Sequence, residues 1–162
     1  MKKPLWPKEV GHFNFNKGIV SATDPCYNDD VWCRLDNIQI KPGEYRCLAY
    51  TVAEGEDEGL VGICQIVYGN MPAPKDGAER ELLGTIGVDA GLAGFYQDKP
   101  NYTDDEWQDF CRKLHPADGG WADFLINRDG FCTSSGGGDG EYPVFAYRNK
   151  EGEIYCLEIC FL

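Results

Sequence analysis

Two strand-like runs at the C-terminal end of the chain constrain the fold most strongly. YPVFAY at 142–147 and IYCLEICFL at 154–162 flank RNKEGE, in which Gly152 can supply the positive φ that a short hairpin loop needs. Both faces of the last run are mostly apolar, and Glu158 is the only polar residue on the face that carries Cys156 and Cys160. We therefore expect a hairpin whose second strand is central in a sheet and covered on both sides.

Much of the remaining chain also consists of short strand-like segments separated by turns. EYRCLAYTV at 44–52 and LVGICQIVYG at 60–69 predict a second hairpin around the acidic loop EGEDEG at 54–59. Shorter segments are HFNF at 12–15, GIVSATD at 18–24 and NIQI at 37–40; four glycines interrupt a strand-like run at 80–96, and NMPAPKDG at 70–77 is typical of a loop. The 162 residues suit a single domain, 1–162. The patterns predict a mainly β fold, either a β-sandwich or an α+β antiparallel sheet.

One amphipathic helix is expected near 103–115. Thr103 and Glu106 form a capping box at its start. An apolar stripe follows at helical spacing, and a proline ends the segment; the stripe consists of Trp107, Phe110, Cys111 and Leu114. A second, shorter helix or an irregular piece is expected over 120–127.

The charge balance limits the partners that this chain can bind. Fifteen Lys and Arg residues against 27 Asp and Glu residues give a formal net charge of −12. A nucleic acid or an anionic membrane surface requires cations on the protein, so we expect neither as a direct partner. The charge is compatible with simple solubility, with cation binding or with docking on a basic protein surface.

The eight cysteines are interpreted together with the absence of an export signal. MKKPLWPKEVG has no apolar segment after its lysines, and no run of about 18 apolar residues occurs. We therefore expect a cytoplasmic protein with reduced thiols, most of them buried as small hydrophobic residues. There is no C-x-x-C pair to suggest a zinc site.

Three aspartate-containing segments, two of them rich in glycine, are the candidate functional sites. They place Asp24 in SATDPCYNDD, Asp89 in IGVDAGLAG and Asp139 in SSGGGDGEYP. Each carboxylate can simply shape its own turn; in the third segment we expect a turn that lets Asp139 approach a neighbouring loop. The alternative is that the three carboxylates gather around a divalent cation such as Ca²⁺ or Mg²⁺, which prefers oxygen ligands. The candidate binding residues are Asp24, Cys26, Tyr27, Asp89, Gly138, Asp139 and Tyr142.

The same three segments carry a family resemblance. D-P-C-Y, V-D-A-G and S-G-G-G-D-G-E-Y-P-V together resemble a family of small bacterial and phage proteins of unknown function, over roughly residues 18 to 162. The motif positions here are Asp24, Pro25, Cys26, Tyr27, Asp89, Gly91, Gly138, Asp139, Gly140, Tyr142 and Pro143. Gly137 departs from the pattern, because relatives often carry an aromatic residue there. The resemblance implies no activity and no catalytic residue.

Two functions from different classes fit these observations. The first is a small acidic intracellular interaction protein with a protein partner, which the resemblance extends to a phage- or mobile-element-encoded inhibitor of a host protein. The second is a divalent-cation-dependent ligand-binding domain or phosphoester hydrolase built on Asp24, Asp89 and Asp139. A nucleophilic enzyme is disfavoured, because no G-x-S-x-G elbow occurs and only two histidines are present.

Overall fold

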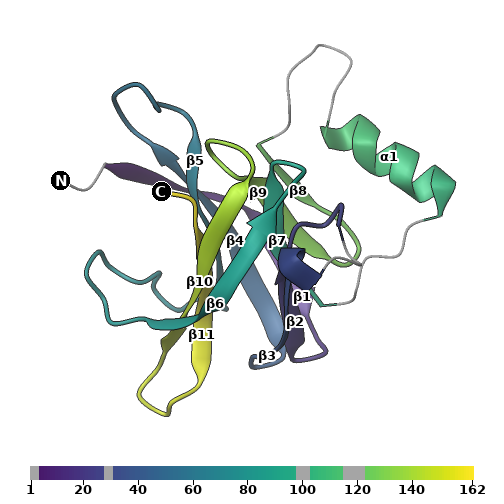
Figure 1. Ribbon diagram of the computed structural model, residues 1–162. Helices are drawn as coiled ribbons and strands as arrows, with labels where there is room; N and C mark the ends of the chain where they lie inside the picture. Colours follow the sequence, from purple (N-terminus) through teal and green to yellow (C-terminus); the bar gives the residue numbers. More distant parts are fainter. Residues whose placement is uncertain (1–3, 28–30, 98–102, 115–122) are drawn as a thin grey trace.

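The computed structural model describes residues 4–27, 31–97, 103–114 and 123–162. In this part of the chain two antiparallel sheets pack as a sandwich (Figure 1). The six-stranded sheet has the order β1 (Leu5–Phe15), β4 (Gly43–Val52), β5 (Val61–Tyr68), β11 (Ile154–Cys160), β10 (Gly140–Arg148) and β6 (Glu81–Val88). The five-stranded sheet has the order β3 (Arg34–Gln39), β2 (Ile19–Thr23), β7 (Leu92–Tyr96), β9 (Gly130–Ser134) and β8 (Phe124–Ile126). A short 3-10 helix, η1 (Val31–Cys33), precedes β3. The sandwich confirms the first of the two expected fold classes.

The core lies between the sheets and follows the alternation of the strands. In β11, Leu157 and Ile159 point into this core and are fully buried. Both hairpins predicted from the sequence are present: β10 pairs with β11, and β4 pairs with β5. β11 lies between β5 and β10, which confirms that the last strand is central.

A long connection covers the outer face of the six-stranded sheet. The segment 69–80 forms no helix or strand, as its composition predicts. Arg46 on β4 holds the start of this segment by donating to the carbonyl oxygens of Gly69 and Met71. Met71 then packs on an apolar cluster of the sheet that includes Leu48 and Cys156. The outward-facing residues of the central strands are therefore buried as well.

The amphipathic helix expected near 103–115 is present as α1 (Asp104–Leu114), and its capping box is formed. Thr103 Oγ1 accepts from the Glu106 amide at 3.2 Å, and the Glu106 carboxylate accepts from the Thr103 amide at 3.4 Å. Phe110 is buried against Leu92, but Cys111 is exposed, so the apolar stripe is narrower than its spacing suggested. Among the described residues no helix is long and apolar enough to cross a membrane.

The expectation of a second short helix or an irregular piece over 120–127 is wrong for residues 124–126. Residues 124–126 form the edge strand β8, which pairs with β9 in the register Phe124↔Thr133 to Ile126↔Phe131. Hydrogen bonds to a neighbouring strand override the weak local preference of such a short segment.

Candidate functional site

Asp24 ties two of the three motif segments together. It follows β2, its side chain is fully buried, and its Oδ2 accepts from the backbone amides of Asp89 and Ala90, each at 2.8 Å. Its Oδ1 accepts from the amide of Cys26 at 3.0 Å. Three backbone N–H groups therefore converge on one carboxylate, which fastens the D-P-C-Y loop to the turn between β6 and β7.

Asp139 adds the third segment to the same turn. Its Oδ1 accepts from the amide of Gly91 at 3.0 Å, and the amide of Ser135 donates to the Gly91 carbonyl at 3.0 Å. Inside the glycine-rich turn, the hydroxyls of Ser135 and Tyr142 both donate to the carbonyl of Gly138, whose φ of 111° suits glycine. The expected approach of Asp139 to a neighbouring loop is confirmed, and the three segments meet at one end of the sandwich.

The environment of this cluster favours neutral groups. Burial raises the pKa of Asp24, its three backbone hydrogen bonds oppose the shift, and the nearby charge of Asp139 adds to it. Burial also raises the pKa of the Cys26 thiol, and the Asp24 charge reinforces that effect. A thiol held protonated in this way is a poor nucleophile, so this geometry gives no support to Cys26 as a nucleophile.

Asp89 contributes to the cluster in a different way from the one its sequence suggests. Its backbone amide, rather than its carboxylate, meets Asp24. Its exposed side chain instead accepts a hydrogen bond from Tyr27, and the Asp89 charge raises the pKa of that phenol. The Tyr27 hydroxyl therefore stays protonated and remains a donor.

The metal hypothesis gains no support from this geometry. The oxygens of Asp24 already accept three amide protons, and one oxygen of Asp139 accepts a fourth. Within the ranges that the structure describes, no three His, Cys, Asp or Glu side chains are grouped so as to hold an ion. Residues 28–30, the end of the SATDPCYNDD segment, lie outside those ranges. A cation bound by Asp24, Asp89 and Asp139 remains a prediction.

Exposed apolar side chains surround the tied loops. The ring of Trp32 lies flat on Gly87, where an added Cβ would come within 2.0 Å of the indole. Trp32 is nevertheless 47% exposed, the neighbouring Val31 is 88% exposed and Tyr27 is 38% exposed. Glu141 on β10 is the register partner of Gly87 on β6, so its side chain points to the same face as Trp32. We name this region the motif surface, and it consists of Tyr27, Val31, Trp32, Asp89, Asp139 and Glu141.

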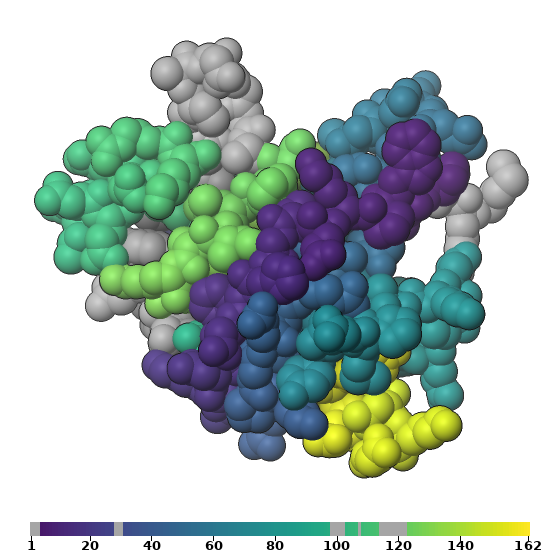
Figure 2. Space-filling view, turned by 180° about the vertical axis from the view of Figure 1, so that it is seen from behind, coloured from purple at the N-terminus to yellow at the C-terminus, as the bar shows by residue number. Residues whose placement is uncertain are grey.

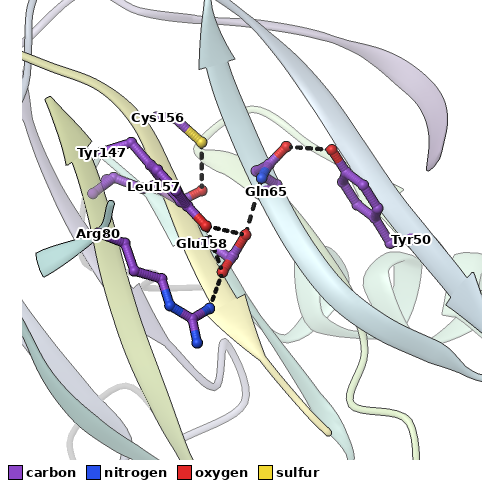
Figure 3. A network of polar contacts seen from close by, with 7 residues as sticks. All are labelled: Tyr50, Gln65, Arg80, Tyr147, Cys156, Leu157 and Glu158. Carbon is purple, nitrogen blue, oxygen red and sulfur yellow. Dashed lines mark hydrogen bonds and ion pairs between the residues drawn. The ribbon is translucent and has the colours of Figure 1, made fainter. Parts of the chain in front are cut away.

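A second polar site lies on the outer face of the six-stranded sheet, beneath the segment 69–80 (Figure 3). Glu158 is only 3% exposed there and accepts from Gln65, Tyr147 and Arg80. The Tyr50 hydroxyl donates to the other end of Gln65 at 2.9 Å. Our sequence reasoning identified none of these residues as a site. The available signal was the isolated Glu158 in an apolar central strand, because a buried charge requires partners.

Comparison of the chain with protein-family models, curated proteins and solved structures found no match.

Proposed function

We propose that this chain is a small acidic intracellular binding protein that docks on a basic protein through the motif surface. The observation that carries the proposal is the placement of Tyr27, Val31 and Trp32 in solvent around a turn that Asp24 holds rigidly. Rigid, exposed aromatic side chains are typical of the residues that dominate protein interfaces.

The charges around these side chains support a basic partner. Asp89, Asp139 and Glu141 are all exposed beside the aromatic residues, and the whole chain carries a net charge of −12. An acidic surface of this kind accelerates association with a basic partner and rejects acidic ones. The finer form of the proposal is that the chain is encoded by a phage or mobile element and inhibits a protein of its host.

Site-specific photocrosslinking tests the proposal. A photoreactive phenylalanine analogue replaces Val31 in one protein and Leu82 in a second, because Leu82 is also apolar and 60% exposed but lies on β6 towards the far end of the sandwich. In lysate of the native host we expect one discrete adduct from position 31 and none from position 82. Identical adduct patterns from the two positions, or no adduct from position 31, would contradict the proposal.

A matched pair of charge reversals tests the electrostatic part. Glu141→Lys changes the motif surface, whereas Glu151→Lys makes the same change of net charge in the β10–β11 turn at the other end of the hairpin. We expect Glu141→Lys to reduce the yield of the adduct from position 31 and Glu151→Lys to leave it unchanged. Equal effects of the two substitutions would show that only the net charge matters.

A further inference from the structure

The segment 69–80 and the outer face of the six-stranded sheet enclose a pocket of about 820 Å³. Figure 2 shows an opening between the teal segment and the body of the molecule. The volume is within the range of small-molecule sites, which is about 300–1,000 Å³. Leu5, Ile63 and Leu162 supply apolar walls, and the Glu158 network supplies a polar floor. This pocket is separate from the motif surface and has no part in the function proposed above.

The carboxylate of Glu158 is largely occupied by partners within the protein. Its Oε1 accepts from Gln65 Nε2 at 3.0 Å and from the Tyr147 hydroxyl at 3.2 Å. Its Oε2 accepts from Arg80 Nη1 at 2.9 Å and lies 3.3 Å from the same hydroxyl. Burial, followed by the Glu158 charge, raises the pKa of Tyr147, so that its phenol remains a proton donor. Three donors therefore occupy three of the roughly four acceptor positions of this ionised carboxylate, and Arg80 balances its charge, so Glu158 competes only weakly for a cationic ligand.

Arg80, in contrast, is held in place and still has donors to offer. Its guanidinium carbon lies 3.7 Å from the centre of the Phe145 ring, and its Nη1 is bound to Glu158. Within the described ranges its polar contacts are with Glu158 and Tyr147, whereas a guanidinium carries five N–H donors. The side chain is 40% exposed and lines the pocket. An arginine fixed on one edge and one face is preorganised to bind an oxyanion with its other edge.

We propose that this pocket binds a small organic acid, with its carboxylate on Arg80 and its apolar body against Leu5, Ile63 and Leu162. Lys75 at the rim adds a second positive charge, and Asp76 beside it has a contact of its own within the protein. The neutralised floor makes a carboxylate with an apolar tail a better fit than an amine with the same tail. The assignment is a binding site and includes no chemical step.

Isothermal titration calorimetry with three eight-carbon probes tests the charge preference. Octanoate, octylamine and 1-octanol share the same tail and differ in their head groups. We expect octanoate to bind with one-to-one stoichiometry and roughly tenfold or more tighter than either of the others, as a charge-assisted hydrogen bond to arginine requires. Octylamine or octanol binding as tightly as octanoate, or no binding of octanoate, would overturn the proposal.

Variants locate the binding within the molecule. Arg80→Gln alone leaves Glu158 buried without its cation and is prone to misfold, so it is combined with Glu158→Gln to keep the floor neutral. We expect this double variant to weaken octanoate roughly ten- to hundredfold. The matched control is Arg148→Gln, because Arg148 is a half-exposed arginine that pairs with Glu81 outside the pocket. Unchanged affinity in the double variant would overturn the proposal, as would an equal loss in the control.

A measurement on the unaltered protein is independent of any folding defect. Nitrogen-15 NMR of arginine side chains reports the guanidinium N–H groups directly. Octanoate should shift the Arg80 signals and leave those of Arg148 in place. Octanoate binding that leaves the Arg80 signals unmoved would place the ligand elsewhere and refute the assignment.

Discussion

Replacing Asp24 by alanine tests the central structural claim, that one buried carboxylate holds the motif loops together. The substitution leaves the amides of Cys26, Asp89 and Ala90 without their acceptor. Each orphaned N–H group costs about 1 kcal/mol where water can partly replace the lost acceptor, so we expect a total loss of about 3 kcal/mol. In a chain of this size that corresponds to a fall in Tm of roughly 6–12 °C.

Asp24→Asn is the informative comparison. Its amide oxygen can replace Oδ2 and keep the bonds from Asp89 and Ala90, but its NH₂ group then faces the amide of Cys26. We expect a loss of about 1–2 kcal/mol, smaller than for alanine. Urea unfolding followed by tryptophan fluorescence measures both values. An Asp24→Ala protein within about 0.5 kcal/mol of the wild type, or an asparagine variant less stable than the alanine variant, would refute the reasoning.

The pH dependence of the stability difference between the wild type and Asp24→Ala tests the charge state of Asp24. Burial raises its pKa in the folded protein above the ordinary value of 3.8, so the folded state holds this proton more tightly than the unfolded state does. The resulting stabilisation is complete below pH 3.8 and is lost as the pH rises through the higher folded-state pKa. The difference in unfolding free energy between wild type and Asp24→Ala should therefore shrink with rising pH. A difference that grows with pH would contradict the expectation.

Four further substitutions probe the sandwich and its helix. Tyr147→Phe removes a donor from the buried Glu158 and should cost about 1–2 kcal/mol in urea unfolding. Gly94→Ala would place a Cβ 1.9 Å from a carbonyl oxygen of β9 and should cost about 3 kcal/mol or more, whereas Gly137→Ala, which meets open space, should be near neutral in the same assay. Thr103→Ala removes the helix cap and should reduce hydrogen-exchange protection in α1 by about 1 kcal/mol, with no change in the strands. Equal costs at Gly94 and Gly137 would contradict the close backbone approach at Gly94. Unaltered protection in α1 would contradict the role of Thr103 as the helix cap.

Part of the candidate site could be predicted because its signals are local. Glycines beside Asp89 and Asp139, and the proline after Asp24, indicated that the three segments form turns. The approach of Asp139 to another loop followed from the shape of its own turn. The hydrogen-bond partner of each carboxylate was harder to predict from the sequence. Asp24 was expected to share a site with the carboxylate of Asp89, yet it binds the backbone of that residue. Every residue except proline has a backbone N–H group, so the residue types do not indicate which of these groups Asp24 binds.

The pocket residues were even harder to predict from the sequence. Glu158 was visible as an anomaly in its strand, but its cation Arg80 is 78 positions away and lies in a connection that has no periodicity. Neither Gln65 nor Tyr147 stands out among the residues of an ordinary strand. The pocket exists because the segment 69–80 crosses the sheet, which depends on the order of strands that are far apart in the chain.

The sequence by itself determined the two hairpins, most of the other strands and the capped helix, because each depends on alternation, turn residues or contacts within a few positions. It did not determine the edge strand β8, which was expected to be a short helix or an irregular piece. Only the tertiary structure decided the order of the strands in the two sheets, the meeting of the three motif segments at the turn between β6 and β7, and the burial of Glu158 beneath the segment 69–80. These features depend on hydrogen bonds and packing between residues 48 or more positions apart. Their formation requires the whole sandwich to close, and no local pattern encodes that event.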